Sequence, residues 1–335
     1  MGAKKPALSP AKQREAEQQA AKAMPIKSTG SDWPEWESKI ERISSRSQSD
    51  ILRGWVAHIP EIFPPGSPPQ ESIGSISTIE ALLFKVPKKG DLTQPISGAR
   101  PAVLREAFYL LHKAIHVQIS CSRGITEGKQ TWAVVDAYQS SLFALASIMG
   151  FLGLTTERDG NNFILVDVWE PGEKKSTSLT KSSVETYKFI RFKSLDHFHK
   201  WAILKRLLRT LKSRSPLAEF LSNAINDLDI KSFALHRNTV HYQSTGWLAD
   251  DLLKDNLPGI ISAAKTPQDL YNEIFKGTIT GTVFLMCCLV ELASEFANYF
   301  FTLGILKDEE PFVGRRIASR NVLTSFDWKY FDPGQ

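Results

Sequence analysis

Residues 131–154, TWAVVDAYQSSLFALASIMGFLGL, decide the fold. The stretch is almost entirely apolar or small and is long enough for about six turns of helix. Gly150 and Gly153 stand where such a helix would end. Apolar residues also recur at helical spacing from 102 to 121, and the polar residues 122–128 interrupt that pattern. Two long apolar helices in succession predict a helical bundle.

The hydrophobic period changes after this pair. Residues 163–169 (FILVDVW) and 187–192 (YKFIRF) have the composition of strands, and the polar linker 170–183 lies between them. They predict a β-hairpin with a long loop. The fold class is therefore mainly α, an up-and-down helical bundle with a small inserted β-hairpin. Further helices are predicted at 195–212, 216–228, 230–242 and 267–303.

Four regions follow along the chain. The first 30 residues are predicted to be a disordered basic tail. The next region holds a predicted helix at 33–55 and the segment 60–69 (PEIFPPGSPP), which is incompatible with helix or a central strand. The expected organisation is a tail at 1–30, a partly irregular accessory region at 31–100, the bundle at 101–305 with its β-hairpin at 163–192, and a C-terminal tail at 306–335.

Composition indicates a globular cytoplasmic protein. With 335 residues and 42% apolar residues the chain is too hydrophobic to be mainly disordered. Three cysteines cannot form a disulfide framework, and Cys287-Cys288 in an apolar helix are predicted to be buried and inert. No signal peptide is visible, and the longest uninterrupted apolar runs fall short of the roughly 18 residues of a membrane span. We therefore expect no membrane association.

The net charge of +5 hides an uneven distribution. Residues 173–214 contain twelve basic and three acidic residues, and the tail at 1–30 contains six basic and two acidic ones. The rest of the chain is consequently acidic. A concentrated basic segment suits a phosphate-bearing polymer, although a solvated helix face would have the same composition. The predicted RNA contacts are Lys200, Lys205, Arg206, Arg209, Lys212 and Arg214.

Aromatic residues alternate with these cations. They could stack on bases, but the interpretation that we favour is an ordinary hydrophobic core of the hairpin and the following helix. The residues concerned are Tyr187, Phe189, Phe192, Phe198 and Trp201.

Residues 235–242, LHRNTVHY, carry the candidate chemistry. On a helix Arg237 and His241 project from the same face, because they are four residues apart. An imidazole can move the proton of a ribose 2′-hydroxyl or of the leaving oxygen, and a guanidinium can stabilise the charge that develops on phosphorus. Asn238 would orient the arginine or the substrate, and His236 is a second candidate acid or base. No Cys/His spacing resembles a zinc site, and no nucleotide-binding or catalytic-triad motif occurs.

The same residues have a structural interpretation. Arg237 and His241 would then cap carbonyl groups at a helix end, or would pair with acidic residues such as Asp227 and Asp229.

With this motif late in a predicted bundle, the chain resembles the HEPN superfamily. Two stretches carry the resemblance: residues 138–154, similar to a Tyr/Ala-rich helix that ends in a Gly turn, and 235–242 with Arg237-Asn238 followed by His241. The resemblance covers roughly residues 100–305. It implies a metal-independent endoribonuclease without a cofactor, acting on RNA as a homodimer. It also implies a toxin or anti-phage defence effector, with an antitoxin or other defence-system protein as partner.

The spacing of the motif leaves alternatives open. Three residues separate Arg237 from His241, whereas four to six usually do so in active members of the superfamily. One residue fewer rotates a side chain by about 100° around a helix. The alternatives are a catalytically inactive HEPN-like module that binds RNA, a nucleotide or a partner protein, and an unrelated helical scaffold.

Overall fold

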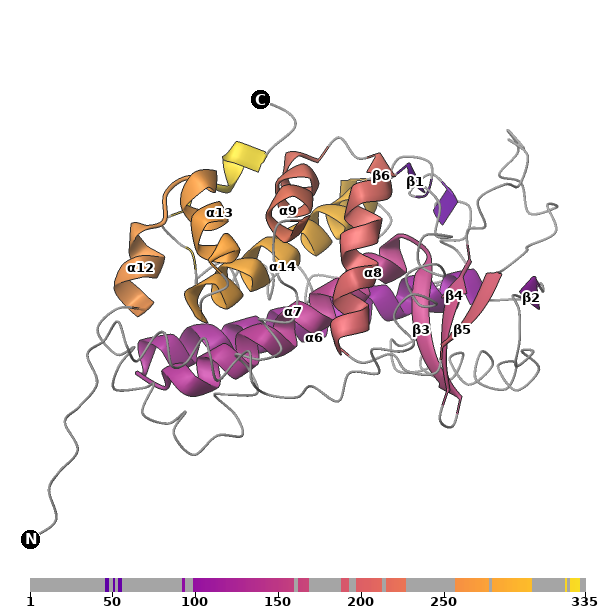
Figure 1. The fold of residues 1–335 in the computed structure, drawn as a ribbon, viewed down its shortest axis with the longest axis horizontal. Helices are drawn as coiled ribbons and strands as arrows, with labels where there is room; N and C mark the ends of the chain where they lie inside the picture. Colours follow the sequence, from indigo (N-terminus) through magenta and orange to yellow (C-terminus); the bar gives the residue numbers. More distant parts are fainter. Residues whose placement is uncertain are drawn as a thin grey trace, which may run out of the picture. The chain divides into compact units, whose positions relative to one another are not determined.

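In the computed structural model, the described residues form a mainly helical fold with a small antiparallel sheet (Figure 1). This confirms the prediction of a mainly helical protein with a small β-sheet. The chain divides into two compact units, residues 1–39 and 40–335, and every described residue belongs to the second. The described residues are 46–47, 51, 54–55, 92–93, 99–159, 162–168, 188–192, 197–212, 215–226, 257–276, 279–302, 323 and 326–331. Their α-helices are α6 (Ala99–Thr126), α7 (Gln130–Phe151), α8 (His197–Thr210), α9 (Pro216–Asn226), α12 (Leu257–Ala263), α13 (Pro267–Phe275) and α14 (Ile279–Thr302).

Helices α6 and α7 form the predicted antiparallel pair. Ser140 and Ser147 on α7 donate hydrogen bonds across the interface to the carbonyl oxygens of Ala114 and Ala107, each at 2.8 Å. Both the donors and the acceptors are seven residues apart, so the helices meet in a heptad register. Gly150 continues this close contact, since a Cβ atom there would lie 2.7 Å from the Cβ atom of Ala107. Small residues therefore let the two backbones approach closely.

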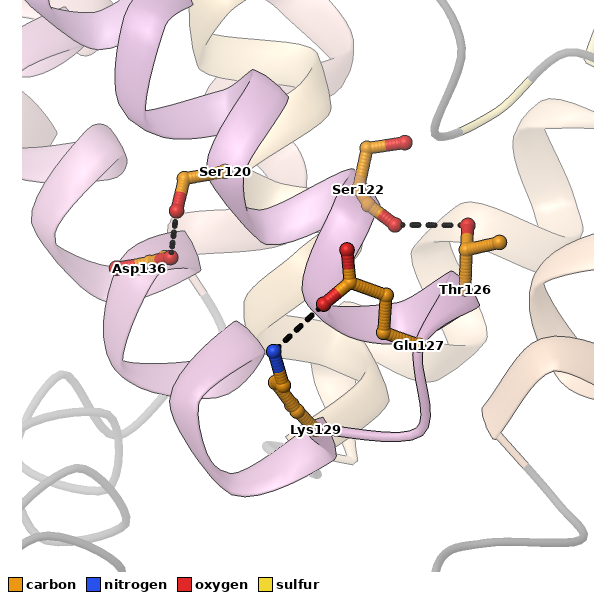
Figure 2. Close-up of polar contacts among 6 residues, drawn as sticks. All are labelled: Ser120, Ser122, Thr126, Glu127, Lys129 and Asp136. Carbon is orange, nitrogen blue, oxygen red and sulfur yellow. Dashed lines mark hydrogen bonds and ion pairs between the residues drawn. The ribbon is translucent and has the colours of Figure 1, made fainter.

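Polar contacts close the tip of this helical hairpin (Figure 2). The turn passes through Gly128, whose φ of 76° lies in the left-handed region that glycine adopts without strain. The contacts are the ion pair of Lys129 with Glu127 at 2.7 Å, the hydrogen bond from the Thr126 hydroxyl to the Ser122 carbonyl at 3.0 Å, and the hydrogen bond from the Ser120 hydroxyl to the Asp136 carboxylate at 2.6 Å.

The carboxyl of Asp136 gives the fold a pH dependence. Burial raises the pKa of Asp136, and the hydrogen bond from Ser120 lowers it in part. The Asp136 carboxyl therefore stays protonated to a higher pH in the folded state than in the unfolded chain. As the pH rises from the unfolded-state pKa to the folded-state pKa of Asp136, the contribution of this group to the free energy of unfolding falls. We expect Asp136→Asn, which keeps an oxygen for Ser120, to remove this loss and to be more stable than the wild type at neutral pH. Urea unfolding between pH 3 and pH 7 measures the difference.

Asp269 provides a control of opposite sign. Its carboxylate accepts hydrogen bonds from Lys265 and Thr266 at the start of α13, and these bonds lower the pKa of Asp269. Its contribution to stability is therefore present above the unfolded pKa and is lost as pH falls. Asp269→Asn should weaken the fold at neutral pH. If the stability of Asp136→Asn follows the same pH curve as that of the wild type, the inference about the half-buried carboxyl of Asp136 is wrong.

Helix α14 forms the centre of the core. It contacts α6, α7, α9, α12 and α13, and residues 281–290 are all buried. The prediction of one helix over 267–303 is wrong, because α13 ends at Phe275 and α14 begins at Ile279. At the corner a Cβ atom on Gly281 would lie 2.3 Å from the carbonyl oxygen of Glu273. The sequence does signal this break, because residues 276–282 (KGTITGT) interrupt the apolar pattern and Gly277 follows the C-cap residue Lys276. The prediction of one helix overlooked that signal.

The predicted pairing of the two strands is confirmed, in a larger sheet. Strand β4 (Asn162–Asp167) pairs with β5 (Lys188–Phe192) in antiparallel register. Two further strands lie outside them, β3 (Leu154–Asp159) and the short β2 (Leu92–Thr93), in the order β2-β5-β4-β3.

Helix α7 is shorter than predicted at its C-terminal end. It ends at Phe151, and Gly153 turns the chain into β3 with a φ of 79°. Leu154, predicted as the last helical residue, is therefore the first residue of a strand.

The described residues before 99 pack into the same fold. Trp55 is fully buried, and its indole nitrogen Nε1 donates to the carbonyl oxygen of Phe151 at 2.7 Å. Strand β1 (Arg46–Ser47) pairs in parallel with β6 (Leu211–Lys212), next to the end of α8. The predicted helix at 33–55 is wrong at 46–47; residues 51 and 54–55 are helical, and the others of that stretch lie outside the described residues.

Residues near the C-terminus also contribute to the core. The 3-10 helix η4 (Trp328–Phe331) packs against α9, where the rings of Phe331 and Phe220 lie 5.2 Å apart. Leu323, Phe326 and Phe331 are buried. These residues lie within 306–335, which was predicted to be a C-terminal tail. The short helix α12 was not predicted.

Two helices are long and apolar enough to cross a membrane by length and composition alone. They are Gln130–Phe151 and Ile279–Tyr299, and 72% and 83% of their apolar windows are buried within the fold. Helices α7 and α14 contact each other, so core packing accounts for their apolar character. The fold is compatible with the predicted soluble protein.

Candidate nucleic-acid interface

Helix α8 carries most of the predicted RNA contacts that the structure describes. One side packs into the core through Trp201, Leu204 and Leu208, which are buried. Because a helix advances by about 100° per residue, Lys205 and Arg209 share one face, whereas the other two cations lie at different angles around the axis. Arg209 is exposed, and Lys200, Lys205 and Arg206 are half-buried.

Lys205 and Arg209 bind the end of α9. The Lys205 ammonium donates to the carbonyl oxygen of Asn226 at 2.7 Å. The Arg209 guanidinium donates to the Asn226 side-chain oxygen, from Nε at 2.6 Å and also from a terminal nitrogen. Asn226 is the last residue of α9, where carbonyl groups lack helical partners and the helix dipole favours cations. These two cations therefore hold a neighbouring helix, a role that competes with contact to phosphate.

The beginning of α9 is also held by another helix. The Ser215 hydroxyl accepts a hydrogen bond from the backbone nitrogen of Ala218 at 3.2 Å, as an N-cap does. The same hydroxyl donates to the Glu295 carboxylate of α14 at 2.5 Å. Helix α9 is thus bound at its start through α14 and at its end through α8. Both ends of α9 are therefore held by neighbouring helices, and the chain continues at residue 227 from the held C-terminal end.

The predicted catalytic residues lie outside the described residues. This applies to Arg237, Asn238 and His241, to the alternative acid or base His236, and to Arg214 of the predicted RNA contacts. Lys212 lies in β6, in register with Ser47 of β1. In the sequence Arg237 follows Asn226 by eleven residues. Among the predicted site residues that are described, the structure brings together Lys205 and Arg209.

Trp201 belongs to the core and is not a base-stacking surface. Its side chain is 1% exposed, and its ring lies 6.4 Å from that of Tyr138 on α7. For this aromatic residue the core interpretation is confirmed. Phe189 and Phe192 lie in β5, whereas Tyr187 is outside the described residues.

The cysteines are unsuited to nucleophilic chemistry, as predicted for Cys287 and Cys288. All three are buried and none forms a disulfide. Burial raises the pKa of Cys287 to about 12, and it raises the pKa values of Cys121 and Cys288 well above the usual range. Since the thiolate is the reactive form of cysteine, these thiols remain protonated and inert.

The sequence contains signals for two of the residues that hold α9. Ser215 followed by Pro216 is the pattern of an N-cap with proline at the first helical position. Asn226 stands near the predicted end of the same helix, where asparagine is favoured. Their partners on α8 and α14 are distant in the sequence, so spacing alone does not predict the contacts.

Comparison with known proteins adds no relative. No family model, curated protein or solved structure matches the chain.

Proposed function

We propose that this protein is a metal-independent endoribonuclease of the HEPN type, with Arg237, Asn238 and His241 as its catalytic group. One observation supports this most directly. In the mainly helical fold, Lys205 and Arg209 of α8 hold Asn226 at the end of α9. Arg237, the first residue of the Arg-Asn…His motif, follows Asn226 by eleven residues. The cation-bearing helix α8 and the acid/base motif would then belong to one part of the chain.

The proposed reaction needs only groups of the protein and the RNA. His241 would accept the proton of the ribose 2′-hydroxyl while its oxygen attacks phosphorus, and the bond to the 5′-oxygen would break. Arg237 would stabilise the charge on the phosphorane, and Asn238 would orient the phosphate. His236, or a histidine of a second protomer, would protonate the leaving oxygen. The products are a 2′,3′-cyclic phosphate and a 5′-hydroxyl end.

RNA would be held by the cations of α8 and its continuation. Lys205 and Arg209 would reach phosphate only by exchanging their partner Asn226. Lys200 and Arg206 lie at other angles around the same helix and are half-buried. Homodimerisation would bring two motifs to one cleft. An antitoxin or another defence-system protein is the proposed regulator.

We expect the full-length protein to cleave RNA in the presence of a chelator and to leave 2′,3′-cyclic phosphate ends. Arg237→Ala and His241→Ala should each abolish cleavage and leave the melting temperature unchanged. Arg123→Ala is the matched control, because this arginine is exposed in the last turn of α6 and should be dispensable. The measurement is RNA integrity in vitro and in expressing cells. Undiminished cleavage in both motif variants would refute the assignment.

The alternative is a catalytically inactive HEPN-like module that binds RNA, a nucleotide or a partner protein. The structural use of Lys205 and Arg209 favours it, as does the short spacing between Arg237 and His241. In that case the two motif variants should lower the melting temperature without removing any activity, which separates the two proposals.

A further inference from the structure

The guanidinium of Arg209 is held by an uncharged side chain. Arg209 is exposed in the last turn of α8, and its Nε atom donates to the Oδ1 oxygen of Asn226 at 2.6 Å. A terminal nitrogen of the guanidinium donates to the same oxygen. Asn226 is exposed as well, and in the part of the chain that the structure describes no carboxylate pairs with Arg209. A full positive charge at the surface is therefore in contact with an acceptor that carries no net charge.

Lys205 and Arg209 bind Asn226 through different groups. The Lys205 ammonium donates to the backbone carbonyl oxygen of Asn226 at 2.7 Å, and the helix fixes the position of that oxygen. Arg209 binds the side-chain oxygen, which can leave by a change of rotamer without moving the backbone of α9. The contact with Arg209 can therefore open while Lys205 still joins the two helices.

An RNA phosphate is a stronger partner for Arg209 than the amide of Asn226. A guanidinium and a phosphate are both charged, and the planar guanidinium donates two parallel hydrogen bonds to two phosphate oxygens. The amide offers one uncharged oxygen, to which both observed bonds go. The C-terminal ends of α8 and α9 repel an anion through their dipoles, but these are partial charges that salt screens. The direct bonds therefore favour the phosphate.

We propose that Arg209 binds a phosphate of RNA and that the side chain of Asn226 regulates this contact by competing for the guanidinium. The inference rests on the proposed function in taking RNA as the ligand. In the free protein Asn226 occupies the guanidinium, and in the complex its side chain turns away and a phosphate takes its place. Asn226 thus lowers the affinity of the free surface for anions, and Arg209 is exposed only to a phosphate that displaces the amide.

The test is the affinity of the full-length protein for a fluorescently labelled single-stranded 2′-O-methyl RNA, which lacks the 2′-hydroxyl nucleophile and is not cleaved. We expect Asn226→Ala to tighten binding by about twofold to tenfold, the factor that corresponds to the net strength of one hydrogen bond. Asn226→Asp should weaken binding, since its carboxylate forms an ion pair with Arg209. Asn223→Ala and Asn223→Asp are the matched controls, because they make the same changes at an exposed position one turn earlier in α9 and should alter the affinity less.

Arg209→Ala provides the second half of a double-mutant cycle. This variant should bind the probe more weakly, and the slope of log Kd against log salt concentration should fall by about one. In the Arg209→Ala background, Asn226→Ala should no longer tighten binding. If Asn226 only stabilises the end of α9, Asn226→Ala lowers the melting temperature and leaves the affinity for RNA unchanged, and the inference is wrong.

The outcome is separable from that of the proposed ribonuclease activity. A protein that shows the expected order of affinities but cuts no ordinary RNA is not a nuclease, yet it supports the competition between Asn226 and phosphate. Equal affinities of the wild type, Asn226→Ala and Asn226→Asp would overturn the proposal. Absence of probe binding by the wild type and by Asn226→Ala at about 100 μM protein, the weak limit of non-specific nucleic-acid binding, would overturn it as well.

Discussion

Gly281→Ala is expected to destabilise the protein by about 3 kcal/mol or more, at the upper end of the usual cost of overpacking. The added methyl carbon would lie 2.3 Å from the carbonyl oxygen of Glu273 and 3.2 Å from the Cα atom of Ile274. Both obstacles are backbone atoms of α13, so no side-chain rotation can relieve the clash. The corner between α13 and α14 would have to open, and α14 lies at the centre of the core. The midpoint of urea unfolding measures the effect.

Gly259→Ala is the matched control for this substitution. Gly259 is exposed in α12, and a Cβ atom there would meet nothing within 4 Å. Alanine is favoured over glycine in a helix by about 0.5–1 kcal/mol, so this variant should be neutral or slightly more stable than the wild type. If both glycine variants unfold at the same urea concentration, the close approach of α13 and α14 does not exist in solution.

Trp55→Ala should cost about 3–5 kcal/mol, the usual range for removing a large buried aromatic side chain. Within the described residues, Trp55 is one of the largest side chains that are fully buried. Its loss would also leave the carbonyl oxygen of Phe151 without the indole donor, at the end of α7 where helical partners are missing. Equilibrium unfolding in urea, followed by circular dichroism, measures the loss.

Trp55→Phe separates the two contributions. Phenylalanine keeps most of the aromatic volume but has no N–H group, so the hydrogen bond at about 1 kcal/mol is lost together with part of the packing. Its stability should lie between those of Trp55→Ala and the wild type. A stability of Trp55→Ala within about 1 kcal/mol of the wild type would show that the segment around residue 55 is not part of the core.

Hydrophobic periodicity predicts the long apolar helices, but it places their ends less accurately. Gly150 and Gly153 mark the end of α7 within a few residues. The polar residues at 122–126, which were expected to interrupt the pattern, instead continue α6 to Thr126. The boundary between α13 and α14 also carries a signal, since residues 276–282 (KGTITGT) contain two glycines and one large apolar residue, and the prediction of one helix overlooked it. The burial of Trp55 depends on a partner 96 residues away, which no local pattern contains.

The candidate interface was predictable as a set of residue types but not as a set of contacts. The concentration of cations around α8 is visible in the sequence. The engagement of Lys205 and Arg209 by Asn226 is not, since it depends on how α8 and α9 pack together.

The seven-residue register between α6 and α7 restricts how this chain can change length. One residue inserted into either helix would turn all following side chains by about 100°, which moves Ser140 and Ser147 away from the carbonyl oxygens they bind. An insertion of seven residues would restore the pairing. Length variation among homologues should therefore occur outside this pair of helices, for instance in the linker at 170–183, where added residues would leave the register intact.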